Sequence, residues 1–309
     1  MNSCIFHEVL AAVFQDRKRS TVKNYRCALE NYALSQGQGL DAILRASPLS
    51  VSRWRRFNAG RIAETTQSLY WVCLRTLWDF LATSGEFPEL KDNPWKSAVV
   101  GRRPSQKNGP KPTNTIPEAI SIGEFLATLP RENWKQRRDH MAISLLFLCG
   151  LRAAEVCALD VEHVYVEPSG RILLYLHNTK TSKLEAQVVP RSLAPDLVHW
   201  AQKIYQRGDR TTPLFPSASL NGQEQGSSRL QYSVLFRAVK AHQKRLGVRL
   251  RIGTHSGRAT VATRLLVTGT PLASAAKFLR HKDPATTLRY CKADRAIQEA
   301  VADDVDAIR

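Results

Sequence analysis

The chain has 309 residues, of which 43% are hydrophobic and 23% are charged. This composition is ordinary for globular proteins and excludes a collagen-like, fibrous or wholly disordered chain. Lysine and arginine number 45 against 27 acidic residues, a formal net charge of +18. In a chain long enough for two domains, this excess predicts a polyanionic partner, either nucleic acid or an anionic membrane surface.

The sequence argues against the membrane alternative. The longest apolar run, residues 141–151, is shorter than the roughly 20 residues that span a bilayer, and it is better interpreted as a buried core helix. The N-terminus lacks a basic region, and His7 and Glu8 interrupt its apolar stretch, so we expect an amphipathic helix rather than a signal peptide. The six cysteines form no C-x-x-C pair, which predicts reduced thiols, a cytoplasmic protein and no zinc site.

Residues 1–100 are predicted to form a helical DNA-binding domain. Ser20 and Thr21 can cap a helix that ends near Gly37, and a second helix is expected over residues 65–83. No residue in this half has a catalytic pattern. The candidate DNA contacts here are Arg53, Arg55 and Arg56.

A linker is predicted at residues 101–117, which contain four prolines, two glycines, four basic residues and no acidic ones. Such a segment suits an extended chain lying along a phosphate backbone. Its candidate contacts are Arg102, Arg103, Lys107 and Lys111. The net charge is +8 over residues 1–117 and +10 over residues 118–309, so both parts are expected to contact a DNA duplex.

Residues 118–309 are predicted to form a mixed α+β domain. Helical patterns cover residues 120–129, 138–149 and 153–159, and helices resume after Pro195. Between them, β-type segments at 164–166, 172–176 and 187–190 alternate with turns and predict a small antiparallel sheet. The expected fold class is therefore mainly α with a small antiparallel β-sheet.

Familiar cofactor motifs are missing. The sequence has no phosphate-binding G-x-x-x-x-G-K-[ST], no G-x-G-x-x-G, no H-E-x-x-H and no G-x-S-x-G. An enzyme with this sequence is expected to work on DNA without ATP, a nicotinamide cofactor or a metal.

Instead, a set of basic residues and a tyrosine occurs in a distinctive order. Arg152 follows Cys-Gly-Leu, with Glu155 one turn later, and His255 and Arg258 form an H-x-x-R motif. The complete set of candidate catalytic residues is Arg152, Lys180 in the turn HNTKTSK, His255, Arg258, His281 and Tyr290.

This order resembles the tyrosine recombinases, the family of phage integrases, transposon integrases and bacterial chromosome-dimer recombinases. The matching stretches are G-L-R-x-x-E, a lysine in a β-hairpin, H-x-x-R, and L-x-H followed by T-x-x-x-Y. The segments STVKNY and LWDFLATSG look like that family's helical, SAM-like core-binding domain, so the resemblance covers most of the chain.

The chemistry of DNA strand exchange asks for these residue types. Tyr290 can attack a phosphodiester and stay attached, conserving the bond energy. Arg152 and Arg258 can hold the non-bridging oxygens with charge-assisted hydrogen bonds. Lys180 can protonate the leaving 5′ oxygen, with Lys183 as a rival. His255 can hold a phosphate oxygen or assist proton transfer at the tyrosine.

Two further groups are expected to support these residues. His281 can donate to the second non-bridging oxygen, and Glu155 can orient an arginine.

The sequence departs from the family pattern at three positions near these residues. It has Gly257 where the family usually has Leu, Ala259 where many members have His, and Arg280 where Gly is common. Arg280 is expected to add positive charge beside the phosphate site and to bind DNA.

The resemblance implies a C-shaped clamp on double-stranded DNA and a homo-tetramer on two DNA sites. It also implies a 3′-phosphotyrosine and a Holliday-junction intermediate. The tail, residues 293–309, has apolar residues at helical spacing and is expected to dock on a neighbouring subunit, the alternative being that it folds against its own subunit. The predicted protein is a mobile-element integrase or a Xer-like recombinase. The alternatives are a monomeric type IB topoisomerase-like enzyme and a catalytically idle DNA-binding protein.

Overall fold

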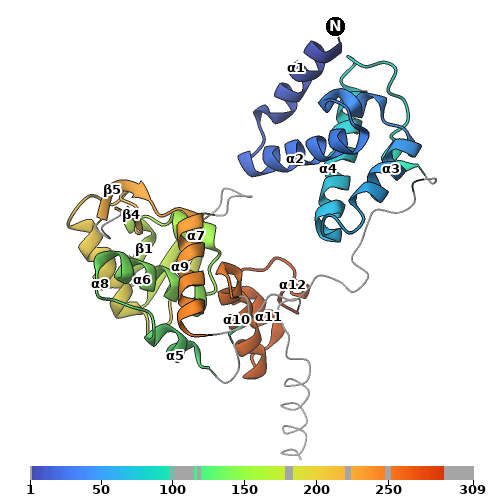
Figure 1. The fold of residues 1–309 in the computed structure, drawn as a ribbon. Helices are drawn as coiled ribbons and strands as arrows, with labels where there is room; N and C mark the ends of the chain where they lie inside the picture. The colour runs from blue at the N-terminus through green and yellow to red at the C-terminus, as the bar shows by residue number, and fades with distance from the viewer. Residues whose placement is uncertain are drawn as a thin grey trace, which may run out of the picture. The chain divides into compact units, whose positions relative to one another are not determined.

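The computed structural model describes residues 2–97, 100, 115–116, 120–177, 184–219, 224–247 and 252–288 (Figure 1). The chain divides into two compact units, Met1–Lys111 and Pro112–Arg309. Several predictions fall outside the described residues: those for Arg102, Arg103, Lys107, Lys111, Lys180, Lys183, Tyr290 and the tail 293–309. Within the described part, no helix is both long and apolar enough to cross a membrane.

The described part of the N-terminal unit is helical. Its elements are α1 (Asn2–Gln15), α2 (Arg19–Gln36), a 3-10 turn (Leu40–Arg45), α3 (Pro48–Asn58), α4 (Glu64–Thr83) and a 3-10 turn (Pro94–Lys96). Apolar faces of these helices enclose one core, in which Trp54 and Trp71 are fully or almost fully buried with ring centroids 6.2 Å apart. Burial of such large aromatic rings is the main source of stability in a helical unit of this size.

Helix boundaries in this unit follow local signals only partly. The predicted helix over 65–83 is confirmed as α4. The predicted caps Ser20 and Thr21 are wrong, because α2 begins one residue before Ser20 and its N-cap is Lys18, which makes no side-chain capping bond. Its end at Gly37 is confirmed, with that glycine in the left-handed region at φ 64°.

The second unit is built around a central helix. Its helices are α5 (Ile122–Ala127), α6 (Trp134–Leu148), α7 (Ala153–Ala158), α8 (Ala194–Tyr205), α9 (Tyr232–Arg245), α10 (Thr254–Val267), α11 (Leu272–Phe278) and α12 (Ala285–Leu288). Every residue of α6 from 138 to 147 is buried. Helices α5, α7, α8, α9 and α10 all contact it, so the predicted core helix is confirmed.

The described strands form two antiparallel sheets. The first pairs β1 (Val164–Val166), β2 (Ile172–His177) and β3 (Leu184–Val188) in that order. The predicted strand at 187–190 is displaced, because the β2–β3 ladder pairs His177 with Leu184 and closes before Pro190, which has no N–H to donate. The second sheet, β4 (Pro216–Ala218) with β5 (Glu224–Arg229), was not predicted. The predicted fold class, mainly helical with a small antiparallel sheet, is confirmed.

Candidate active site

Arg152 stands at the N-terminus of α7, directly after a tight turn. The turn depends on Gly150, whose φ of +62° favours glycine; a Cβ there would also meet Leu279 Cδ2, at the end of a side chain that would have to shift. Glu155, one turn later, accepts the Arg152 backbone N–H at 2.7 Å through Oε2, and its Oε1 lies 2.7 Å from Nη1 of Arg152. The Arg152 side chain is 45% exposed, so its guanidinium is oriented and still open to solvent.

Glu155 is the point where two arginines meet. Its Oε2 lies 2.7 Å from Nη2 of Arg280, and the Glu155 side chain is only 15% exposed. Burial by itself raises the pKa of Glu155, but the charge of Arg280 and the hydrogen bonds from Arg152 outweigh it and lower the pKa below its ordinary value. The carboxylate is therefore ionised at neutral pH.

Arg280 ends helix α11 in an unusual conformation. The N–H of Arg280 donates to Lys277 O at 3.0 Å and that of His281 to Ala276 O at 2.9 Å, which is a Schellman motif with Arg280 at its left-handed position. Its φ is +53°, and it is the one non-glycine residue with positive φ among the described residues. Glycine is the ordinary residue at such a position, which explains why the family commonly has it.

The DNA contact predicted for Arg280 stays a prediction. Its side chain is 7% exposed and is engaged by Glu155, by Glu185 with Nε at 3.8 Å, and by the side-chain oxygen of Gln187. Its Nε has no hydrogen-bond partner among the described residues, and the side chain lines the pocket that also holds Arg152. In this structure Arg280 therefore connects α7 with β3.

Arg258 and His281 form a buried pair. Arg258 is 1% exposed and donates to Gly150 O at 2.9 Å, to Leu279 O, and through Nε to Nε2 of His281 at 2.9 Å. Because that Nε2 accepts, the proton of neutral His281 sits on Nδ1, which lies 2.7 Å from Thr287 Oγ1. Burial and neighbouring guanidinium groups, Arg258 foremost, lower the pKa of His281 to about 4.

The prediction that His281 donates to a phosphate oxygen stays a prediction. In this structure both of its ring nitrogens are engaged, and Nε2 accepts the hydrogen bond that orients the guanidinium of Arg258.

His255 lies in the first turn of α10, three residues before Arg258, and its side chain is exposed. Desolvation by surrounding protein, followed by the charges of Arg258 and Arg152, lowers its pKa, so the ring is neutral at pH 7. Gly257 beside it packs against the backbone of α6. A Cβ there would lie 2.7 Å from the carbonyl carbon of Leu146, which accounts for the departure from leucine.

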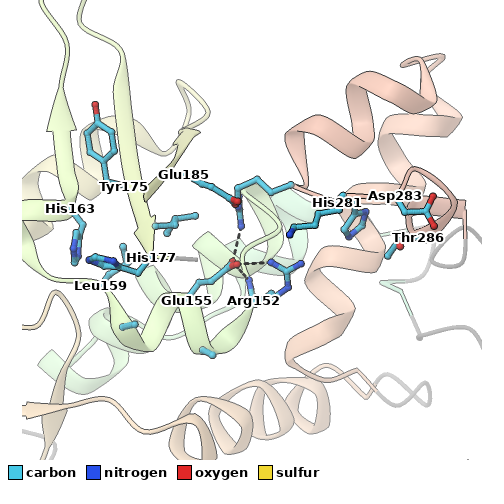
Figure 2. A pocket seen from close by; sticks show the side chains of 15 residues that line it. Arg152, Glu155, Leu159, His163, Tyr175, His177, Glu185, His281, Asp283 and Thr286 are labelled. Carbon is cyan, nitrogen blue, oxygen red and sulfur yellow. Dashed lines mark hydrogen bonds and ion pairs between the residues drawn. The ribbon is translucent and has the colours of Figure 1, made fainter. Parts of the chain in front are cut away.

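A pocket of about 410 Å³ gathers part of the predicted set (Figure 2). Arg152, Glu155, Arg280 and His281 line it. Arg258 contacts His281 but does not itself line the pocket, and His255 is also outside the lining. The polar lining that the sequence did not single out is His163, Tyr175, His177, Glu185, Lys282, Asp283 and Thr286.

One signal for the missed residues was present in the sequence. Glu185 and Gln187 are two apart on β3 and pair with Leu176 and Leu174, whose side chains are buried. Polar residues on the inner face of a strand need partners, which points to a charged group reaching them from another element. Sequence alone does not tell that this group is Arg280.

The predicted DNA contacts in the N-terminal unit differ from one another. Arg53 and Arg56 are exposed one turn apart on α3. Arg55 is different, because its guanidinium donates to Val100 O and lies 5.6 Å from the ring centroid of Trp71. Arg55 therefore packs within its own unit, and its predicted DNA contact stays a prediction.

Helix α2 adds a basic face that the sequence reasoning missed. Arg19, Lys23 and Arg26 are exposed and spaced by four and three residues, so they lie on one side of the helix. Helical spacing of basic residues within the predicted helix was the signal available.

One acidic cluster in the described residues has ligand atoms close enough for a metal: Asp160, Glu162 and His163. Two of these are already engaged, since Arg229 lies 2.7 Å from Asp160 Oδ1 and the Asp160 N–H donates to His163 Nδ1 at 2.8 Å. This cluster is better explained as an ion-paired turn.

Comparison with known proteins agrees with the resemblance in the sequence. The profile described as the phage integrase family matches residues 121–296. The chain is 28% identical over 219 residues to a tyrosine recombinase of Pseudothermotoga lettingae, covering 70% of this chain and 66% of that protein. It is 26% identical over 274 residues to tyrosine recombinase XerC of Shewanella amazonensis, covering 89% and 85%.

The fold is shared with a solved structure of the XerH site-specific recombinase bound to a palindromic difH substrate in a post-cleavage complex. The TM-score is 0.69 at 18% identity, over 88% of this chain and 78% of that one. The match over residues 121–296 includes the helices and strands that carry Arg152, His255, Arg258 and His281. The chain belongs to the phage integrase family of tyrosine recombinases, enzymes that break and rejoin DNA.

Proposed function

We propose that this protein is a site-specific recombinase that cuts and rejoins double-stranded DNA through a 3′-phosphotyrosine on Tyr290. The observation that carries the proposal is the convergence of Arg152, Arg258 and His281 from α7, α10 and the segment after α11. Arg152 and His281, more than 100 positions apart in sequence, line one pocket, and Arg258 contacts His281 beside it. Such a cluster suits the binding of a phosphate group.

The two arginines stabilise the charge that develops on the phosphate. Arg152 offers a partly exposed guanidinium whose direction is fixed by Glu155. Arg258 is held from behind by Gly150 O and His281, and it contributes a fixed positive charge next to the pocket. Charges that are already in place cost no reorganisation during the reaction, which is the usual origin of a large catalytic contribution.

In the chemical step, the phenolic oxygen of Tyr290 attacks the scissile phosphorus and the bond to the 5′ oxygen breaks. The phenolic proton passes to His255, whose lowered pKa leaves its ring neutral and able to accept. The leaving 5′ oxygen takes a proton from Lys180, or from Lys183 if that residue is the acid. The products are a 3′-phosphotyrosine and a free 5′ hydroxyl, and religation reverses each transfer.

The proposed assembly is a homo-tetramer that joins two DNA sites and exchanges strands through a Holliday junction. Each subunit grips the duplex with both units, and the exposed residues Arg53 and Arg56 provide contacts in the first. The tail 293–309 is proposed to dock on a neighbouring subunit. The reaction is an integration or Xer-like recombination, without a metal or nucleotide cofactor.

Substitution of the nucleophile tests the proposal. Tyr290→Phe keeps the ring and removes the attacking oxygen, so this variant should bind DNA but form no covalent complex on a nicked suicide substrate. Tyr232→Phe is the matched control, because Tyr232 is an exposed tyrosine at the start of α9. It should form the adduct like the wild-type protein. An adduct with Tyr290→Phe, or its loss with Tyr232→Phe, would move the nucleophile elsewhere.

A second experiment tests recombination itself. Duplexes selected by binding from a random pool provide two copies of a site on one supercoiled plasmid. The proposal expects deletion or inversion of the DNA between the copies. Relaxation without rearrangement would instead indicate the topoisomerase-like alternative.

A further inference from the structure

We propose that Arg280 is a positioning residue that keeps Arg152 available to phosphate by holding the second oxygen of Glu155. It does so from a fixed place between α7 and β3. This inference rests on the catalytic role proposed above for Arg152.

The backbone conformation at Arg280 indicates that its side chain makes stabilising contacts that a glycine could not make. The residue occupies the left-handed position that ends α11, with φ +53°. An L-residue adopts this conformation with strain, and glycine adopts it freely. A non-glycine residue persists there when contacts of its side chain compensate for the strain.

Those contacts join three elements of the fold. From the end of α11, the guanidinium reaches Glu155 on α7 at 2.7 Å, and Glu185 and Gln187 on β3. The Arg280 side chain is 7% exposed, so these interactions are poorly screened by water. An arginine fork with several acceptors is held in one orientation.

Glu185 and Gln187 on β3 have Arg280 as a partner, just as Arg280 has them. Glu185 and Gln187 lie on the same face of the sheet as Leu174 and Leu176, and Gln187 is 3% exposed. Polar groups in such places are costly unless they are hydrogen-bonded. Arg280 gives both residues a partner, and they in turn fix its position relative to α7.

The consequence for Arg152 follows from how Glu155 divides its oxygens. Oε1 faces Nη1 of Arg152, whereas Oε2 is shared between the Arg152 backbone N–H and Arg280. Without Arg280, both oxygens become available to the Arg152 guanidinium, which prefers a two-bond pairing with a carboxylate. Glu155 would then compete with the scissile phosphate for Arg152. With Arg280 in place, Glu155 orients the Arg152 side chain without pairing with the part of the guanidinium that is to bind phosphate.

The test compares Arg280→Gly with Arg280→Lys, Arg229→Ala and the double variant Arg280→Gly/Glu155→Gln, all in the full chain. Glycine suits the positive φ, so the first variant removes the side chain without adding strain. Arg229 is the matched control, because it pairs with a carboxylate, that of Asp160, elsewhere in the same unit. The readouts are single-turnover cleavage of a suicide substrate, DNA affinity and thermal stability.

We expect Arg280→Gly to bind DNA like the wild-type protein and to cleave it about 10- to 100-fold more slowly, the size of effect that a misplaced catalytic group produces. Arg280→Lys should cleave at an intermediate rate, since one ammonium can hold Glu155 but not β3 as well. Arg229→Ala should cleave at the wild-type rate even if it is less stable. Glu155→Gln in the Arg280→Gly background should raise the cleavage rate again, because a neutral amide competes poorly with phosphate.

This recovery separates positioning from mere stabilisation, since a second substitution at a stabilising contact would not restore the rate. The inference is overturned if Arg280→Gly cleaves at the wild-type rate, or if adding Glu155→Gln gives no recovery. If Arg280→Gly does not fold, the same comparison is made with Arg280→Lys and Arg280→Lys/Glu155→Gln, and it decides by the same criterion. Failure of the proposed function is distinguishable, because then the wild-type protein itself forms no Tyr290-dependent adduct.

Discussion

Gly257 offers a direct test of how the site is supported, because the substitution Gly257→Ala adds only one methyl group. It lies in the interior of α10, three residues after the N-terminal Thr254, and faces the backbone of α6. In Gly257→Ala the added Cβ would lie 2.7 Å from the carbonyl carbon of Leu146 and 3.2 Å from the nitrogen of Phe147. Those atoms belong to a buried helix backbone and cannot rotate away.

The expected loss follows from two opposing contributions. Carbon atoms in ordinary contact are about 3.5–4.0 Å apart, so α10 must move by about 1 Å. Overpacking of this kind typically costs about 1–3 kcal/mol, and a contact with backbone belongs at the upper end. Alanine regains about 1 kcal/mol through its better helix propensity. The net destabilisation is therefore about 2 kcal/mol, which corresponds to a fall in Tm of about 4–8 °C for a unit of this size.

Scanning calorimetry of the full chain measures this, since each compact unit can contribute its own transition. Gly123→Ala is the matched control, because Gly123 lies in the first turn of α5 and a Cβ there would meet only Ser121 Oγ at 3.8 Å. That variant should be as stable as the wild-type protein or more stable by up to about 1 kcal/mol. The reasoning is refuted if Gly257→Ala is as stable as Gly123→Ala.

The same substitution should also slow catalysis, because α10 carries His255 and Arg258. A shift of about 1 Å in a group that holds phosphate can cost about 10²-fold in rate. Single-turnover cleavage at a temperature where Gly257→Ala is still folded checks this. Cleavage at the wild-type rate would show that α10 adjusts without moving its functional residues.

Three other outcomes are expected. Lys180→Ala should cleave ordinary DNA about 10²- to 10⁴-fold more slowly than the wild-type protein. Its cleavage rate should recover on a substrate with sulfur at the 5′ bridging position, because the thiolate leaves unprotonated. Recovery by Lys183→Ala instead would identify Lys183 as the general acid. Replacing Arg53 and Arg56 by alanine should reduce the slope of log affinity against log salt by about 0.9 for each phosphate that these arginines neutralise in the wild-type complex, and an unchanged slope would place these residues off the DNA. The pKa of His281, about 4, lies below the ordinary 6.5, so the unfolded chain takes up its proton first and stability should fall as pH decreases from about 6.5 to about 4. In urea unfolding, His281→Gln should reduce this dependence and leave the part that His140, whose pKa is also lowered to about 4, contributes.

Sequence patterns were sufficient for elements whose signals are local. The helix over 65–83 and the core helix through 141–148 follow from apolar spacing, because one helix face or the whole helix is buried. The position of Arg152 at a helix start with Glu155 one turn later also follows from a local motif. Such features depend on neighbours within about four residues.

Features that depend on distant residues were not predictable in this way. The third strand begins at Leu184 because it pairs with His177, and its polar inner face is explained only by Arg280, more than 90 residues later. The tautomer of His281 likewise depends on Arg258 reaching it from another helix. Charge alone predicted that Arg280 and Arg55 would bind DNA, and it did not reveal the protein groups that both side chains contact.

Two of the positions at which the sequence is expected to depart from its family, Gly257 and Arg280, belong to the structure around the proposed reacting groups. At Gly257 a side chain is missing, and α10 lies directly on the backbone of α6. At Arg280 a side chain is present where glycine is common, and it fills the space between α7 and β3. A leucine at 257 would clash with Leu146, and a glycine at 280 would remove the donor to the side-chain oxygen of Gln187. Each departure therefore requires a matching feature elsewhere in the chain, so introducing the family-typical residue singly should impair this protein.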